Sequence, residues 1–166
     1  MTTFFPADLE ARAQALVQLY RGLGVTLVTA ESCTGGLVAA LLTEVPGSSA
    51  CVERGFVTYS NAAKSEEIGV PAELIDRHGA VSREVAQAMA EGALAHSAAD
   101  VAVAITGIAG PDGGSAEKPV GLVHFGCATR TGGTRTLERR FGDLGRSGVR
   151  RAAVETALDL LTEAVR

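Results

Sequence analysis

The sequence has few aromatic side chains: they make up 4% of its residues, and tryptophan is absent. Much of its apolar content is Ala and Val, so we expect a core of small, closely packed side chains. Cysteine is scarce too, and Cys33, Cys51 and Cys127 form no C-x-x-C pair and no His/Cys ligand cluster. This scattered, odd-numbered set indicates a reducing compartment, and we expect no disulfide framework, no metal site and no cofactor.

Long apolar runs and an excess of positive charge are also lacking. No uncharged apolar run approaches the ~20 residues of a membrane span. Charged residues at positions 8, 10 and 12 come too early for a signal peptide. The formal net charge of −4 does not favour a nucleic-acid partner. We therefore expect a soluble cytoplasmic protein that binds neither nucleic acid nor membranes.

Helix and strand patterns alternate along the 166 residues, without a linker, a repeat or a low-complexity tract. The apolar runs 25–30 and 101–105 predict strands buried on both faces, as central parallel strands are. A late hairpin turning at residues 131–133 makes the sheet mixed. The other predicted strands are 51–59, 120–129 and 134–141, and the predicted helices are 6–21, 37–44, 61–68, 71–77, 82–96 and 145–165. We expect Gly22 and Gly24 to end the first helix, and Asn61 and Ser82 to cap two others. The pattern predicts one layered α/β domain over residues 1–166.

Two loops rich in glycine and hydroxyl side chains follow the two buried strands. One is residues 31–36, which leads directly into a helix, and the other is residues 106–115. In open α/β sheets, ligands bind outside the carboxyl ends of such strands, so neighbouring loops of this kind would frame one pocket. Neither loop has the G-K-[ST] of a Walker loop or a G-x-G-x-x-G fingerprint.

The first loop, E-S-C-T-G-G, suits more than one role. A helix start offers unpaired N–H groups and a positive dipole end, and Gly35 and Gly36 would let a phosphate approach closely. The same N–H groups could form an oxyanion hole for a carbonyl attacked by Ser32. From spacing alone, Ser32 or Thr34 could instead simply cap the helix. Cys33 is a competing nucleophile, or else a small core residue.

A serine nucleophile needs a base, and histidine is the usual one. The three histidines, at positions 78, 96 and 124, lie beside a loop glycine, near a helix end and within a strand, where exposed or packed histidines are common. Lys64 follows the end of a strand by one helical turn. A lysine drawn into a pocket can lose its proton near neutral pH and act as a base. The alternative is a solvated surface lysine.

Arginines gather late in the sequence, at positions 135, 139, 140, 146, 150 and 151. Arg146 and Arg150 stand four positions apart at the start of the last helix, and so share one face. Positive charge at the start of a helix is unfavourable because the helix dipole is positive there, and a bound anion would explain why two arginines occupy this position. A solvated face offset by neighbouring acids is the alternative.

Five motifs, in unbroken order between about Leu16 and Leu161, closely resemble the CinA C-terminal domain family. They are A-E-S-C-T-G-G at 30–36, G-F-V-T-Y-S-N-x-x-K at 55–64, G-A-V-S at 79–82, T-G-I-A-G-P-D-G-G at 106–114 and E-K-P-V-G at 117–121. The resemblance implies a three-layer α/β/α domain with a mixed, mostly parallel sheet. It also implies hydrolysis of the carboxamide of nicotinamide mononucleotide to nicotinate mononucleotide and ammonia, within pyridine nucleotide recycling.

The resemblance also implies roles for individual residues. The family's serine nucleophile falls on Ser32, its lysine base on Lys64, and a tyrosine that relays or orients the proton on Tyr59. Substrate-binding roles fall on Thr34, Gly35, Gly36, Thr106, Gly107, Arg146 and Arg150. The segment 142–146 is longer here than the family's commoner G-D-R. Two alternatives are an amidase for another small amide and a non-enzymatic nucleotide-binding or regulatory module. Small α/β hydrolytic domains often pair, which makes a homodimer one expectation.

Overall fold

The computed structural model describes residues 2–166, which build one five-stranded sheet of order β2-β1-β3-β4-β5. The strands are β1 (Leu27–Glu31), β2 (Val52–Val57), β3 (Val101–Gly107), β4 (Leu122–Thr129) and β5 (Gly133–Arg140). Strand β1 pairs in parallel with β2 and β3, whereas β4 is antiparallel to β3 and β5. The prediction of a mixed sheet with a late hairpin is confirmed.

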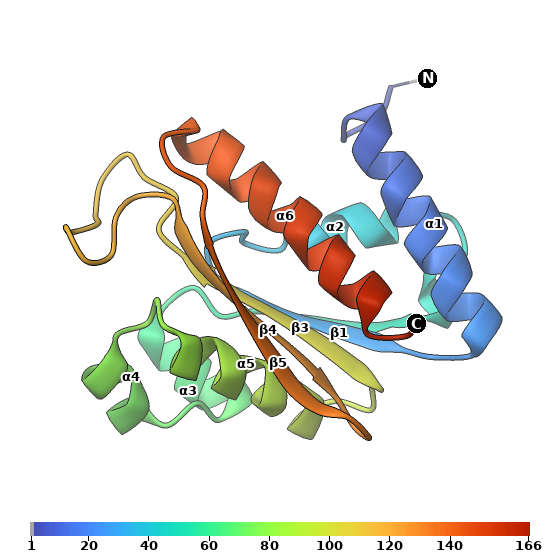
Figure 1. Cartoon of the computed structure of the whole chain (residues 1–166). Helices are drawn as coiled ribbons and strands as arrows, with labels where there is room; N and C mark the ends of the chain where they lie inside the picture. The colour runs from blue at the N-terminus through green and yellow to red at the C-terminus, as the bar shows by residue number, and fades with distance from the viewer. Residues whose placement is uncertain (1) are drawn as a thin grey trace.

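Helices cover both faces of this sheet (Figure 1). One face carries α1 (Ala7–Leu23), α2 (Leu37–Thr43) and α6 (Gly145–Glu163); the other carries α3 (Asn61–Ile68), α4 (Ala72–His78) and α5 (Arg83–Ala95). A short 3-10 helix, η1 (Ser48–Ala50), precedes β2. Successive strand residues face opposite layers, so Leu27 belongs to the first apolar cluster and Val28 to the second. The three-layer α/β/α arrangement is confirmed.

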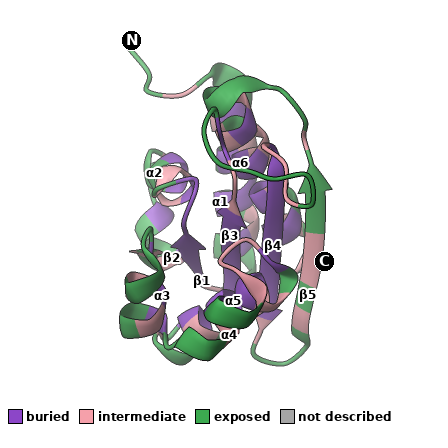
Figure 2. Ribbon diagram, turned by 90° about the vertical axis from the view of Figure 1, so that its left-hand side faces the viewer, coloured by how far each residue is buried: buried purple, intermediate pink, exposed green. Residues whose placement is uncertain are grey.

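The central strands are covered on both sides, as their apolar runs predict. All residues of β1 are buried, whereas β5 is largely exposed at the sheet edge (Figure 2). Small residues allow the layers to approach closely. A Cβ atom on Gly126 of β4 would lie 2.4 Å from the carbonyl oxygen of Ala86 in α5. The low aromatic content therefore matches the close approach of the helices to the sheet.

The caps of two helices differ from the prediction. Helix α1 continues through Gly22 to Leu23, and Gly24 alone ends it, in the left-handed conformation with φ 66°. Helix α3 is capped by Ser60, whose hydroxyl accepts a hydrogen bond from the Ala63 N–H at 3.0 Å. Asn61 is instead the first helical residue, because the extended backbone leaving β2 continues as far as Ser60.

The carboxyl ends of β1, β2 and β3 meet at one edge of the sheet. Residues 32–36, 58–60 and 108–121 follow these strands directly. The antiparallel hairpin also brings the end of β5 to this edge, where the Phe141 N–H donates to the Gly121 carbonyl at 2.9 Å. In Figure 1, the segment 108–121 projects beyond the sheet near the start of α6. Segments far apart in the sequence are thus gathered at one place.

Candidate active site

Ser32 and Lys64 form a buried hydrogen-bonded pair at this edge. Ser32 is the first residue after β1, and its N–H donates to the Ile105 carbonyl of β3 at 3.0 Å. Lys64 approaches from α3, and its Nζ lies 3.1 Å from the Ser32 Oγ. Ser32 is 8% exposed and Lys64 is 1% exposed. A hydroxyl and an amine are therefore within hydrogen-bonding distance and largely buried, which is the arrangement that a serine nucleophile and a lysine base would need.

Burial of Lys64 disfavours its charged form. Besides Ser32, its Nζ contacts the carbonyl oxygens of Thr58 at 2.9 Å and Tyr59 at 3.4 Å. No Asp or Glu within residues 2–166 forms an ion pair with it. Burial lowers the pKa of Lys64, because the ammonium loses its hydration. The neutral amine is the form that can accept a proton from serine.

Cys33 is less suited to act as the nucleophile, although it lies next to Ser32. It is 7% exposed and packs in the apolar cluster formed with α1, α2 and α6. Burial raises the pKa of its thiol to about 11, which disfavours the reactive thiolate. The hydrogen bond from Lys64 goes to Ser32. The geometry therefore favours Ser32.

A cleft of about 230 Å³ opens in front of Ser32. The two predicted loops line it together, with Ser32 and Cys33 from the first and residues 107–110 and 112–114 from the second. Tyr59, which is 62% exposed, and Arg146 complete the lining. One guanidinium nitrogen of Arg146 donates to the Gly110 carbonyl at 2.7 Å, and the other lies 3.3 Å from the Tyr59 Oη. The cleft thus joins the Ser32–Lys64 pair to a cationic side chain.

Several predicted binding residues do not line this cleft. Thr34 is fully buried, and its hydroxyl donates to the Glu31 carboxylate at 2.7 Å. The Gly35 N–H donates to the Ser32 carbonyl at 3.0 Å, so it is occupied within the loop. The Thr106 hydroxyl donates to the Ala80 carbonyl at 2.8 Å and ties the segment before α5 to the end of β3. These contacts shape the walls behind the cleft.

Arg150 lies on another side of the loop from the cleft. Its Nε donates to the Cys33 carbonyl at 3.0 Å, and its Nη2 lies 3.4 Å from the Thr34 carbonyl. Of the two arginines expected to share an anion, only Arg146 lines the cleft.

Glu31 is a site residue that the sequence analysis did not single out. It is fully buried, and its carboxylate accepts hydrogen bonds from the N–H groups of Val38 at 2.9 Å and Ala39 at 3.1 Å. Two N–H groups at the start of α2 are therefore occupied by the chain's own anion. An acid at the end of an apolar strand, just before a helix, is the signal that could have found it, because helix starts favour negative charge.

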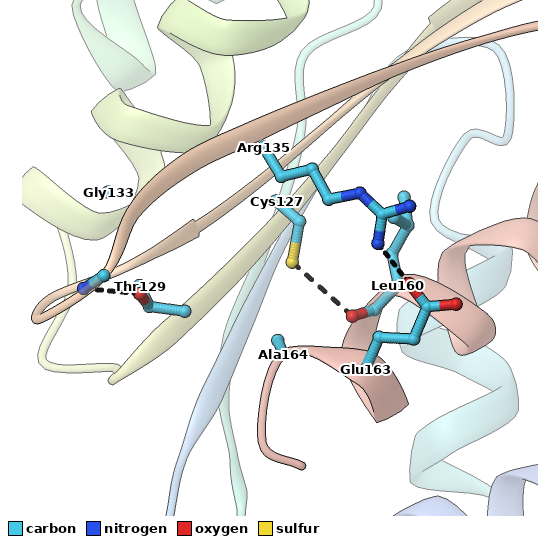
Figure 3. Close-up of a pocket in the computed structure, with 8 residues that line it drawn as sticks. Cys127, Thr129, Gly133, Arg135, Leu160, Glu163 and Ala164 are labelled. Atoms are coloured by element: carbon cyan, nitrogen blue, oxygen red, sulfur yellow. Dashed lines mark hydrogen bonds and ion pairs between the residues drawn. The ribbon is translucent and has the colours of Figure 1, made fainter.

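A second cavity, of about 250 Å³, lies at the opposite end of the sheet, between the β4–β5 turn and the end of α6 (Figure 3). Its charged side chains pair with each other, Arg135 with Glu163. The Cys127 Sγ lies 3.8 Å from the Leu160 carbonyl oxygen, and burial raises the pKa of this thiol to about 11. The charged side chains of this cavity neutralise each other and its thiol is held in the unreactive protonated form. The residues that line it therefore include no counterpart of the Ser32–Lys64 pair.

Within residues 2–166, no three His, Cys, Asp or Glu side chains come together in a group that could hold a metal ion. None of the helices in this part of the chain is both long enough and apolar enough to cross a membrane.

The model of the CinA C-terminal domain matches residues 9–165. The chain belongs to this family. The CinA domain is 52% identical over 156 residues to the nicotinamide-nucleotide amidohydrolase PncC of Escherichia coli K12, with 93% of each chain covered. It is 60% identical over 126 residues to a protein of Symbiobacterium thermophilum named as competence-damage inducible, and the matched part is 30% of that longer protein.

Solved structures agree with this membership. The CinA domain superposes on the competence/damage inducible protein CihA of Agrobacterium tumefaciens with a TM-score of 0.97 and 52% identity, covering 99% of this chain and 100% of the other. The CinA superfamily protein of Klebsiella pneumoniae 700603 gives a TM-score of 0.89 and 36% identity, covering 95% and 97%. The predicted family and fold are confirmed.

Proposed function

We propose that this CinA domain is a nicotinamide-nucleotide amidohydrolase, an enzyme that hydrolyses nicotinamide mononucleotide to nicotinate mononucleotide and ammonia. One observation carries the proposal: the buried Ser32–Lys64 pair opens onto a cleft that also holds Tyr59 and Arg146. Its match to the E. coli amidohydrolase covers nearly the full length of both chains and supports the choice of substrate.

The reaction begins when the Ser32 Oγ attacks the carboxamide carbon and Lys64 accepts the hydroxyl proton across their 3.1 Å hydrogen bond. The tetrahedral intermediate collapses as Lys64 returns this proton to the amide nitrogen, and ammonia leaves. Water then attacks the acyl ester on Ser32, and Lys64 accepts a proton from the water and returns it to the Ser32 Oγ as the bond to the acyl group breaks, which releases the carboxylate product. Tyr59 orients this exchange, since its carbonyl lies 3.4 Å from the Lys64 Nζ.

The oxyanion of the tetrahedral intermediate and the 5′-phosphate of the substrate bind to different parts of the site. Although Thr34 and Gly36 are not among the residues that line the cleft, their N–H groups donate no backbone hydrogen bond within residues 2–166, and we assign the oxyanion to them. We assign the 5′-phosphate to Arg146, which lines the cleft and has further N–H groups besides those that contact Gly110 and Tyr59. Pockets that enclose a whole ligand start at roughly 300 Å³, so part of the nucleotide extends from this cleft into solvent.

The direct test measures ammonia released from nicotinamide mononucleotide by purified wild type, Ser32→Ala and Cys33→Ala, without added metal. We expect turnover by the wild type and Cys33→Ala, and a loss of at least about 1,000-fold in Ser32→Ala. Activity kept in Ser32→Ala but lost in Cys33→Ala would instead assign the nucleophile to Cys33. A folded wild type without turnover would contradict the proposed substrate, and stabilisation by the nucleotide alone would then indicate a binding module.

A further inference from the structure

Two side chains of opposite charge hold the loop that carries Ser32. Glu31, at the end of β1, accepts hydrogen bonds from the Thr34 hydroxyl and from the Val38 and Ala39 N–H groups at 2.7, 2.9 and 3.1 Å. Arg150, from α6, contacts the carbonyl oxygens of Cys33 and Thr34 at 3.0 and 3.4 Å. The carboxylate therefore accepts hydrogen bonds from donors of the loop and of the helix that follows it, and the guanidinium donates hydrogen bonds to carbonyl oxygens of the loop.

The contact from Arg150 also sets the direction of a neighbouring N–H group. In a planar trans peptide, the carbonyl and the following N–H point in opposite directions. Arg150 holds the Cys33 carbonyl and therefore directs the Thr34 N–H away from itself. This N–H is one of the two that the proposed function assigns to the oxyanion.

The hydrogen bonds of Glu31 do more than cap a helix. The N-cap of α2 is Gly36, and no side chain bonds there in the usual way. Instead, the carboxylate comes from five positions earlier and spans the whole nucleophile loop, from the strand to the first turn of the helix. An ionised acceptor makes hydrogen bonds about twice as strong as a neutral one. The length and shape of this bridge therefore fix where Ser32 lies.

We propose that Glu31 is a positioning residue. Its carboxylate, opposed by Arg150, keeps the Ser32 Oγ at Lys64 and keeps the loop N–H groups directed at the reacting carbonyl. The inference rests on the proposed function for the identity of the amide, but the reactivity of Ser32 itself can be measured without that substrate. A displacement of about 1 Å in such a site can slow a reaction about 100-fold.

Thr34 allows a test that leaves the buried charge in place. Thr34→Val removes the hydroxyl that donates to Glu31 and keeps the side-chain volume, while Thr34→Ser restores the hydroxyl. Thr43→Val is the matched control, because it removes a hydroxyl at the other end of α2 that donates to the Ala39 carbonyl at 2.8 Å. Glu31→Gln completes the set. The readouts are the rate at which a fluorophosphonate labels Ser32, kcat and KM for nicotinamide mononucleotide, and the melting temperature.

We expect labelling and kcat to fall by about 10- to 100-fold in Thr34→Val and Glu31→Gln, with KM nearly constant because Arg146 is untouched. Thr34→Ser should recover most of both rates, and Thr43→Val should match the wild type. Wild-type labelling and kcat in Thr34→Val, or losses that only track the unfolded fraction, would overturn the role of Glu31. A wild type that is labelled at Ser32 but releases no ammonia would overturn the substrate, and the labelling rates would still decide the role of Glu31.

Discussion

Replacing Lys64 by Met tests whether a neutral amine drives the reaction. Burial lowers the pKa of Lys64 below its ordinary value, so the folded enzyme gains its base as the pH rises through that lowered pKa. The rate should therefore rise with pH and then level off. Without the base we expect a loss of about 100- to 10,000-fold, equivalent to about 2.7–5.4 kcal/mol of barrier. Lys64→Met should also lose the acidic limb of the pH–rate profile.

The same group makes stability depend on pH, and the sign follows from proton counts. Between the lowered pKa and the ordinary value of about 10.4, the unfolded chain binds a proton that the folded chain does not. The free energy of unfolding should rise with pH through this window, by at most about 1.36 kcal/mol per pH unit for one proton. At a pH below the lowered pKa, Lys64 is protonated in both the folded and the unfolded chain, so its contribution to the free energy of unfolding no longer changes with pH.

The chain makes this measurement simple, because it contains two lysines, Lys64 and Lys118. NMR of side-chain-labelled lysine should give two titrating signals, assigned with Lys118→Arg, and the Lys64 signal should titrate below about 10.4. Urea unfolding at a series of pH values should show the stability rise in the wild type and in Lys118→Met, but not in Lys64→Met. A Lys64 signal that titrates at or above the ordinary value, or an acidic limb that persists in Lys64→Met, would refute the reasoning.

Two further predictions concern binding and packing. Arg146→Ala should raise KM for nicotinamide mononucleotide at least about tenfold, with a smaller change in kcat. Nicotinamide riboside has no phosphate, so its KM should not rise in this variant. Equal effects on both substrates would show that the phosphate binds elsewhere. Thr29→Val should raise the free energy of unfolding by about 1 kcal/mol in urea titrations, because the buried Thr29 hydroxyl has no partner in the described chain. As a control, Thr26→Val removes a 3.1 Å hydrogen bond to Asp100 and should lower the free energy of unfolding by a similar amount. If Thr29→Val is less stable than the wild type, the Thr29 hydroxyl has a hydrogen-bond partner after all.

The sequence predicts the sheet better than it predicts the contacts at the site. The apolar runs of β1 and β3 sufficed to locate the central strands, because strands covered on both faces are mostly apolar. By contrast, nothing in the local sequence shows that Lys64 touches Ser32, since this depends on how α3 packs after β2. Arg150 shows the same limit: its helical position was predicted, but its contact with the Ser32 loop is set by the packing of α6. The homodimer and the cytoplasmic location stay predictions.

The contact between Arg150 and Cys33 joins residues 117 positions apart. During synthesis, Ser32 and Lys64 leave the ribosome long before α6 does, so the two groups proposed to react are made well before the arginine that contacts the Ser32 loop. A product cut short before Gly145 would carry a serine and a lysine without the guanidinium that orders the loop and without Arg146. The proposed amide hydrolysis therefore needs α6 to be in place as well as the segments that carry Ser32 and Lys64.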